Sequence, residues 1–102
     1  MKIPNKLKIG GHIVKVLKDY KFIERSDIVG QAIYCQNEIR LCSQTEMGPI
    51  AEGVVAANFL HEIFHHVCER YNGEQLPEEV VVRVSEGLFQ VLRDNKLRFD
   101  EP

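Results

Sequence analysis

Apolar positions in the first 45 residues come in short runs separated by turn residues, a pattern typical of β-strands. Four such runs fall in this region: residues 6–9, 12–17, 30–35 and 39–42. Gly10-Gly11 separates the first two runs and Gln36-Asn37-Glu38 the last two, so the pattern predicts two hairpins. Residues 19–30 between them predict a loop with room for a short strand. Residues 1–45 are therefore expected to be mainly β, as a small antiparallel sheet.

The pattern becomes helical after Cys42. Gly48-Pro49 indicates a helix start and Asn72-Gly73 a helix end, so a helix is predicted over residues 49–72. Pro77 followed by two glutamates predicts the start of a second helix, over residues 77–95.

Each predicted helix carries apolar residues at helical spacing. The stripe on the first helix is Ala56, Leu60, Ile63, Val67 and Tyr71, with Phe64 beside it; that on the second is Val81, Val84, Leu88, Val91 and Leu92. The short loop between the helices predicts an antiparallel helix hairpin. The fold class expected for residues 1–102 is α+β in one domain, with the sheet first and the helix pair after it.

Composition narrows the class of protein without identifying a function. The 102 residues are 44% hydrophobic and 27% charged, with a net charge of −2, as in ordinary globular proteins. The absence of a basic excess argues against nucleic-acid binding, and no apolar run is long enough for a membrane span or signal peptide. Three cysteines, an odd number, favour reduced thiols and a cytoplasmic location.

The pattern H-E-x-x-H occurs in the predicted first helix, as His61, Glu62 and His65. Residues four apart stand one turn apart on a helix, so both imidazoles can reach one zinc ion. Glu62 lies about 100° from His61 and can take a proton from a water molecule without being a ligand. The alternative is that all three are polar residues on a solvated helix face. His66 points away from the ligand side and is expected to be partly exposed.

A catalytic zinc site needs a third protein ligand, and the second helix offers carboxylates. Glu79 and Glu86 lie seven residues apart, opposite the apolar stripe of that helix. In an antiparallel hairpin, Glu86 is level with Glu62, while Glu79 is level with Glu69, roughly 6 Å further along. We therefore expect Glu86 to be the third ligand and keep Glu79 as the second choice. Either glutamate can also be a solvated residue of the helix surface.

Two other chemistries are weaker hypotheses. Cys35, Cys42 and Cys68 with a histidine could form a structural metal site, but their spacing is irregular and no C-x-x-C occurs. Cys68 is three residues from His65, yet the local signatures of cysteine nucleophiles are absent.

The segment FLHEIFHHV, followed by a helix that ends in SEGLFQVLRDN, resembles small metallopeptidases of the phage and prophage type. It is similar to ImmA/IrrE-type peptidases and minimal gluzincins. The opening KIGGHIVKV also looks like that group, so the resemblance covers nearly the whole chain. It implies a zincin-like fold whose sheet edge holds a peptide substrate. It also implies zinc ligands His61 and His65, Glu62 as general base, and Glu86 or Glu79 as third ligand.

The sequence thus predicts a zinc-dependent peptidase acting on a peptide or protein substrate. Two other hypotheses are a non-catalytic protein-binding module with the same fold, and a purely structural helix pair without metal. Tyr34 and Tyr71 have the right chemistry to stabilise an oxyanion, although Tyr71 falls on the apolar stripe of its helix.

Overall fold

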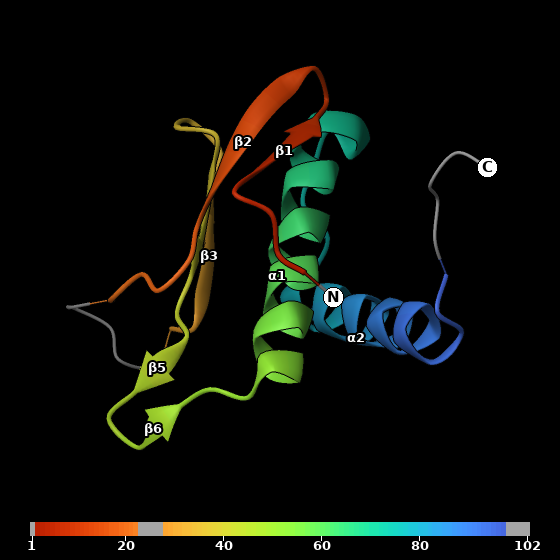
Figure 1. Cartoon of the computed structure of the whole chain (residues 1–102). Coiled ribbons are helices and arrows are strands. Elements are labelled where there is room, and N and C mark those ends of the chain that lie inside the picture. Colours follow the sequence, from red (N-terminus) through yellow and green to blue (C-terminus); the bar gives the residue numbers. More distant parts are fainter. Residues whose placement is uncertain (1, 23–27, 98–102) are drawn as a thin grey trace.

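Both predicted hairpins are present. The computed structural model describes residues 2–22 and 28–97, and Figure 1 gives its elements. Strand β1 (Lys6–Ile9) pairs antiparallel with β2 (His12–Leu17), and β3 (Gly30–Ile33) pairs antiparallel with β4 (Glu38–Leu41). In the predicted loop, residues 19–22, 28 and 29 form no strand, and Gly30 already belongs to β3. Residues 23–27 lie outside the described residues.

The four-stranded sheet is mixed, so the prediction of a purely antiparallel sheet is wrong. The strand order is β1-β2-β4-β3, and β2 runs parallel to β4. The second hairpin docks through β4, whose residues Ile39 and Leu41 are almost fully buried. Strands β2 and β4 are central, and β1 and β3 lie at the edges of the sheet.

The first helix begins later than predicted. Gly48-Pro49 forms the short strand β6 (Gly48–Pro49), which pairs with β5 (Gln44–Thr45), instead of starting a helix. Helix α1 spans Glu52–Val67 and packs against one face of the sheet. The fold class is α+β, with a small sheet followed by two helices.

Helix α1 buries only part of the stripe predicted from the sequence: Ala56 is buried and Ile63 packs partly against the core. Its buried residues are Ala56, Phe59, Glu62 and His66. Phe59 joins a core built from five strand residues: Ile9, Val14, Val16, Ile39 and Leu41. Two polar residues take part in this face because the sheet supplies contacts for them, which a count of apolar residues cannot reveal.

The end of α1 widens into a π-helix, η1 (Cys68–Asn72), which ends at Gly73 in the left-handed conformation. A π-turn changes the direction of the side chains that follow. Tyr71 is therefore 70% exposed instead of lying in the core, and its hydroxyl accepts a hydrogen bond from the backbone N–H of Gly10 at 3.1 Å. The β1–β2 turn is fastened to the end of the helix in this way.

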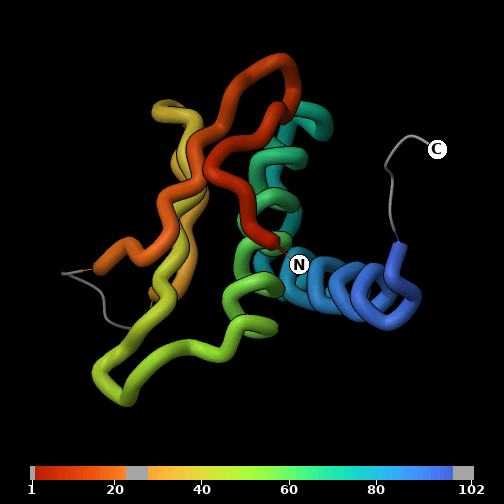
Figure 2. Tube along the Cα trace, in the orientation of Figure 1, coloured from red at the N-terminus to blue at the C-terminus, as the bar shows by residue number. Residues whose placement is uncertain are grey.

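Helix α2 (Glu78–Asp94) crosses α1 instead of running back along it, so the predicted antiparallel helix hairpin is wrong. Figures 1 and 2 show α2 leaving the α1 contact and extending away from the sheet. Of the predicted stripe on α2, only Val81 is fully buried. Val84, Leu88 and Val91 are more than two-fifths exposed. Among the described residues, neither helix has the length and apolar character that a bilayer crossing requires.

Candidate metal centre

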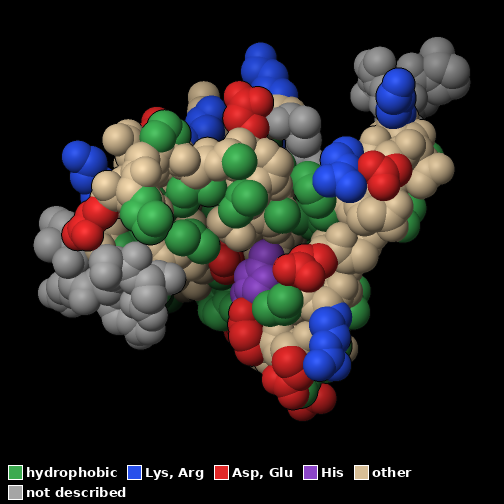
Figure 3. Space-filling view, turned by 90° about the horizontal axis from the view of Figure 1, so that it is seen from below, with side chains coloured by type: hydrophobic (Ala, Val, Ile, Leu, Met, Phe, Trp, Pro, Cys, Tyr) green, Lys and Arg blue, Asp and Glu red, His purple; other side chains and the backbone are tan. Residues whose placement is uncertain are grey.

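Three side chains from two helices converge where α2 begins. Nε2 of His61 lies 2.8 Å from Oε1 of Glu78, and Nε2 of His65 lies 3.0 Å from Oε2 of the same carboxylate. The two Nε2 atoms are 3.1 Å apart. In Figure 3 the histidine side chains form a surface patch with acidic side chains beside it.

This donor set could hold a metal ion. Four ligands about 2.0–2.1 Å from a tetrahedral zinc ion lie roughly 3.3 Å from one another. The two nitrogens are 3.1 Å apart, and each lies 2.8 or 3.0 Å from a different oxygen of Glu78, so the donors are close to the spacing of a zinc site. The side chains of His61 and His65 are 18% and 15% exposed, while that of Glu78 is 63% exposed. The group is therefore open to solvent on the Glu78 side, where a water or substrate could complete the coordination.

The structure brings together the two predicted histidines but neither predicted glutamate. Glu79 and Glu86 are both exposed and lie outside the group that His61, His65 and Glu78 form. The prediction placed Glu86 level with Glu62 on the assumption of an antiparallel hairpin. Because α2 crosses α1, only its first turn approaches the histidines, and Glu86 lies eight residues, or about 12 Å, further along.

Glu78 had a signal in the sequence that the predictions missed. It precedes Val81 by three residues and Ser85 by seven, so it shares a helix face with two residues that are buried. A carboxylate on the buried face, directly after the loop from the histidine helix, is better placed than one on the opposite face.

Gln75 is a second residue that the sequence did not indicate. Its side-chain NH2 donates to the backbone carbonyl of His65 at 3.0 Å and to the carboxylate of Glu69 at 3.2 Å. Its Oε1 therefore faces Nδ1 of His65, at 3.0 Å. An amide oxygen only accepts, so Nδ1 carries a hydrogen, which leaves Nε2 as the ring nitrogen that can bind a metal ion.

Replacing Gln75 by leucine is expected to weaken zinc binding by about 10–100-fold, because outer hydrogen-bond partners orient metal-binding histidines. Gln75→Glu keeps the acceptor for Nδ1 and should bind zinc more tightly than Gln75→Leu. Competition with a chromophoric chelator measures both affinities. Glu74→Gln, in the same loop, is the matched control; equal affinities for Gln75→Leu and the unaltered protein would contradict this role.

Glu62 is not on the solvated face predicted for it. It is 7% exposed and turns towards β3, where a Cβ added to Gly30 would lie 2.8 Å from its Oε2. Glycine at this position thus leaves room for the carboxylate. Burial raises the pKa of Glu62 to about 7; the charge of His65 lowers that pKa and the charge of Glu78 raises it.

The pKa of Glu62 makes the stability of the metal-free protein fall as the pH rises. In the folded chain the carboxyl holds its proton up to about pH 7, whereas in the unfolded chain it loses the proton near its ordinary value of 4.5. The folded state therefore binds more protons between these values. Each pH unit is worth about 1.36 kcal/mol, so roughly 3 kcal/mol of stability is lost across the window.

Urea denaturation of the metal-free protein at pH 5 and pH 8 tests this, with Glu62→Gln as the comparison. The unaltered protein should lose stability relative to Glu62→Gln as the pH rises. Burial lowers the pKa of His66, so this histidine stabilises the folded state less as the pH falls. Both proteins contain His66, so its contribution cancels in the comparison. A constant difference between the two proteins would disprove the burial of a titrating Glu62.

Tyr34 follows β3 and lies near the carboxylates of the candidate site. Burial raises its pKa to about 12, and the charges of Glu69, Glu62 and Glu78 raise it as well. Its hydroxyl therefore keeps its proton at neutral pH and can donate a hydrogen bond. Tyr71, the other tyrosine considered, is occupied by its contact with Gly10.

His66 is fully buried, not partly exposed as predicted. Its Nε2 lies 2.8 Å from the backbone carbonyl of Glu38, to which it donates, so this histidine fastens α1 to β4. Its ring also meets the ring of Tyr34 edge-on, with centroids 5.2 Å apart. The contacts give His66 a structural role.

The cysteine hypotheses gain no support from the geometry. Cys35 is exposed, Cys42 and Cys68 are buried, and all three thiols are free. Over residues 2–22 and 28–97, His61, His65 and Glu78 are the one group of three or more donors close enough to share an ion. The three-cysteine site therefore does not assemble in this part of the chain.

Comparisons of the chain with models of protein families, with curated proteins and with solved structures give no match. The functional interpretation consequently depends on the residues themselves. What the geometry provides is a pair of histidines and a glutamate converging at the start of α2, beside a buried glutamate with a raised pKa.

Proposed function

We propose that this protein is a small zinc-dependent peptidase of the minimal gluzincin type. The observation that carries the proposal is the convergence of His61, His65 and Glu78 on one point, within 4.8 Å of one another. This is the donor set of two histidines and one glutamate found in catalytic zinc sites of proteases. In this proposal Glu78 takes the place that the sequence resemblance left to Glu86 or Glu79.

Zinc held by these residues supplies Lewis acidity and lowers the pKa of water towards 7. Glu62 is the general base: it accepts the proton of the attacking water and passes it to the leaving amine. A raised pKa near 7 suits a group that must both take up and release a proton at neutral pH. The Tyr34 hydroxyl, protonated at this pH, is our candidate donor to the developing oxyanion.

The substrate we propose is an extended peptide bound along β3. This strand is at the edge of the sheet, so its outer backbone groups can pair with an added strand. Gly30 begins β3 and lies against the Glu62 carboxylate, which brings the proposed base next to that edge. The three free thiols agree with a reducing compartment, and we place the protein in the cytoplasm.

A second candidate function is a protein-binding module that keeps the fold and the metal without turnover. The uncovered apolar side chains of α2 favour it, since exposed apolar surface is typical of protein-binding sites. The peptidase needs both the metal centre and Glu62 as a base, whereas the binding module needs neither for its contact with a partner.

Metal removal and return separate the peptidase from a metal-free structural role. We expect one zinc per chain by elemental analysis, and its loss in His61→Ala and His65→Ala. Zinc-dependent cleavage of a peptide library should stop with a chelator and return with added zinc. Zinc binding without cleavage would support the binding module. A folded native protein that takes up no zinc would refute the peptidase.

A further inference from the structure

We propose that α2 pairs with α2 of a second copy of this chain, antiparallel, to form a reversible homodimer. The surface involved is defined by Val84, Leu88 and Val91, which we call the outer stripe. These side chains are 45%, 43% and 42% exposed, although their 3–4 spacing is that of a packed helix face.

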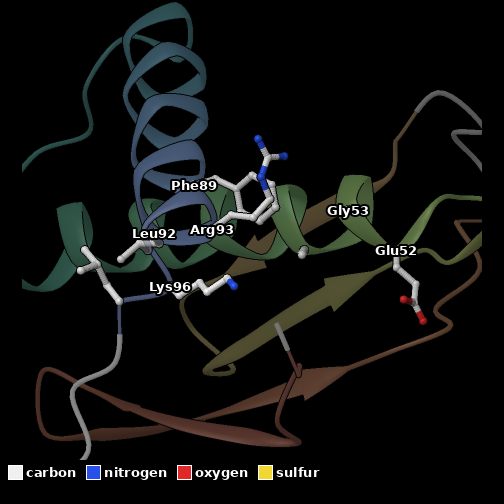
Figure 4. A pocket seen from close by; sticks show the side chains of 8 residues that line it. Glu52, Gly53, Phe89, Leu92, Arg93 and Lys96 are labelled. Carbon is white, nitrogen blue, oxygen red and sulfur yellow. The ribbon is translucent and has the colours of Figure 1, made fainter.

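The outer stripe is open because of where α2 crosses α1. The contact with α1 uses the face that holds Val81 and Ser85, both buried. Beyond the crossing, α2 and α1 enclose a groove of about 550 Å³, shown in Figure 4 with Phe89, Leu92 and Arg93 of α2 beside it. The outer stripe continues from the face of Val81 along α2, since Leu88 follows Val81 by two turns, and its three side chains remain more than two-fifths exposed.

The outer stripe is complementary to itself when two helices run in opposite directions. Val84 and Val91 are equally distant from the point between Gly87 and Leu88, so a two-fold axis there places each Val84 opposite the partner's Val91. Gly87 lies beside the stripe, and a Cβ added to it would meet no atom within 4 Å in one chain. A glycine in the middle of a helix lowers the stability of the helix, and no contact within one chain requires it here. Its small size would allow the backbones of two helices to approach closely.

Charge supports the same pairing. Arg83 and Asp94 are about three turns apart, so they lie on one flank of the outer stripe. Antiparallel helices bring matching flanks together, which sets Arg83 of each chain near Asp94 of the other. Within its own chain Asp94 pairs with Arg93 at 2.8 Å, so Arg83 of the partner would be a second cation beside this carboxylate. Both side chains are exposed, and the net charge of −2 per chain opposes association only weakly.

The size of the contact indicates a weak dimer. Helix α2 has 17 residues and is about 25 Å long, so one helix pair stays below the roughly 1,200 Å² of stable interfaces. We expect the 11.7-kDa chain to double its mass between concentrations of about 5 µM and 500 µM. The pairing is independent of zinc and should occur in the metal-free protein.

Sedimentation equilibrium of the full chain tests the proposal. Leu88→Glu should remain a monomer over this range, while Gln44→Glu, which adds the same charge on β5 and not on α2, should dimerise normally. Circular dichroism checks that both variants are folded. A monomeric unaltered protein, or a dimer that Leu88→Glu leaves intact, overturns the proposal.

Two further variants test the geometry. Arg83→Glu should weaken the dimer severalfold, because it turns the attraction to the partner's Asp94 into a repulsion. Gly87→Ala should raise the melting temperature of the monomer and yet weaken association, since alanine favours the helix but separates the backbones. Stronger association in Gly87→Ala would exclude the close approach.

Discussion

Replacing Glu78 by alanine is expected to weaken zinc binding by at least about 100-fold. Loss of an outer hydrogen-bond partner already lowers metal affinity by about 10–100-fold, and Glu78 is placed to bind the ion directly. The Glu78 carboxylate contacts both histidines, and it is the one carboxylate of the donor group. Its removal therefore leaves the two histidines as the remaining donors. Competition with a chelator at constant pH gives the affinity of each variant.

The two glutamates favoured by the sequence provide matched controls on the same helix. Glu79→Ala and Glu86→Ala remove the same chemical group from α2 but leave the donor set intact. Both should bind zinc within about twofold of the unaltered protein, because exposed charges at this distance are screened. Weak binding in Glu86→Ala together with normal binding in Glu78→Ala would show that the helices pack as a hairpin after all.

Glu62→Gln is expected to keep zinc binding and to lower peptide cleavage by about 10²–10⁴-fold, the usual contribution of a general base. Glutamine has nearly the same shape, so the packing against Gly30 is retained while the proton acceptor is lost. The measurement is the rate of cleavage of a peptide substrate with zinc content determined on the same sample. The metal centre and the catalytic step are thereby assessed separately.

Glu52→Gln is the control for that experiment, since Glu52 is an exposed acid in the first turn of the same helix. It should leave both zinc content and cleavage unchanged. Cleavage by Glu62→Gln at the rate of the unaltered protein would remove Glu62 from the mechanism and require another base. An unaltered protein that binds zinc but cleaves nothing would favour the protein-binding function.

Local features of the fold could be predicted from the sequence. The glycine pair at residues 10–11 and the turn at 36–38 mark both hairpins, and Pro77 marks the start of α2 to within one residue. The spacing of His61 and His65 is likewise a local property of one helix, and their nitrogens do meet. Each of these features depends on residues a few positions apart. At that distance, the known repeat of a helix or a strand is enough to predict which side chains lie together.

Features that depend on packing between elements could not be predicted in the same way. The crossing of α1 and α2 selects Glu78 over Glu86, and no property of either helix alone fixes that crossing. Glu62 and His66 are buried because the sheet offers Gly30 and the Glu38 carbonyl as neighbours. The π-turn at the end of α1 also breaks the 100° rule that placed Tyr71 in the core.

The central claim is that His61, His65 and Glu78 hold one zinc ion. Anomalous scattering at the zinc edge, measured on crystals of the zinc-bound protein, tests it most directly. We expect one peak per chain, about 2.0–2.2 Å from both Nε2 atoms and from a carboxylate oxygen of Glu78. A peak bonded to Glu86 or Glu79, or no peak beside the two histidines, would contradict the claim.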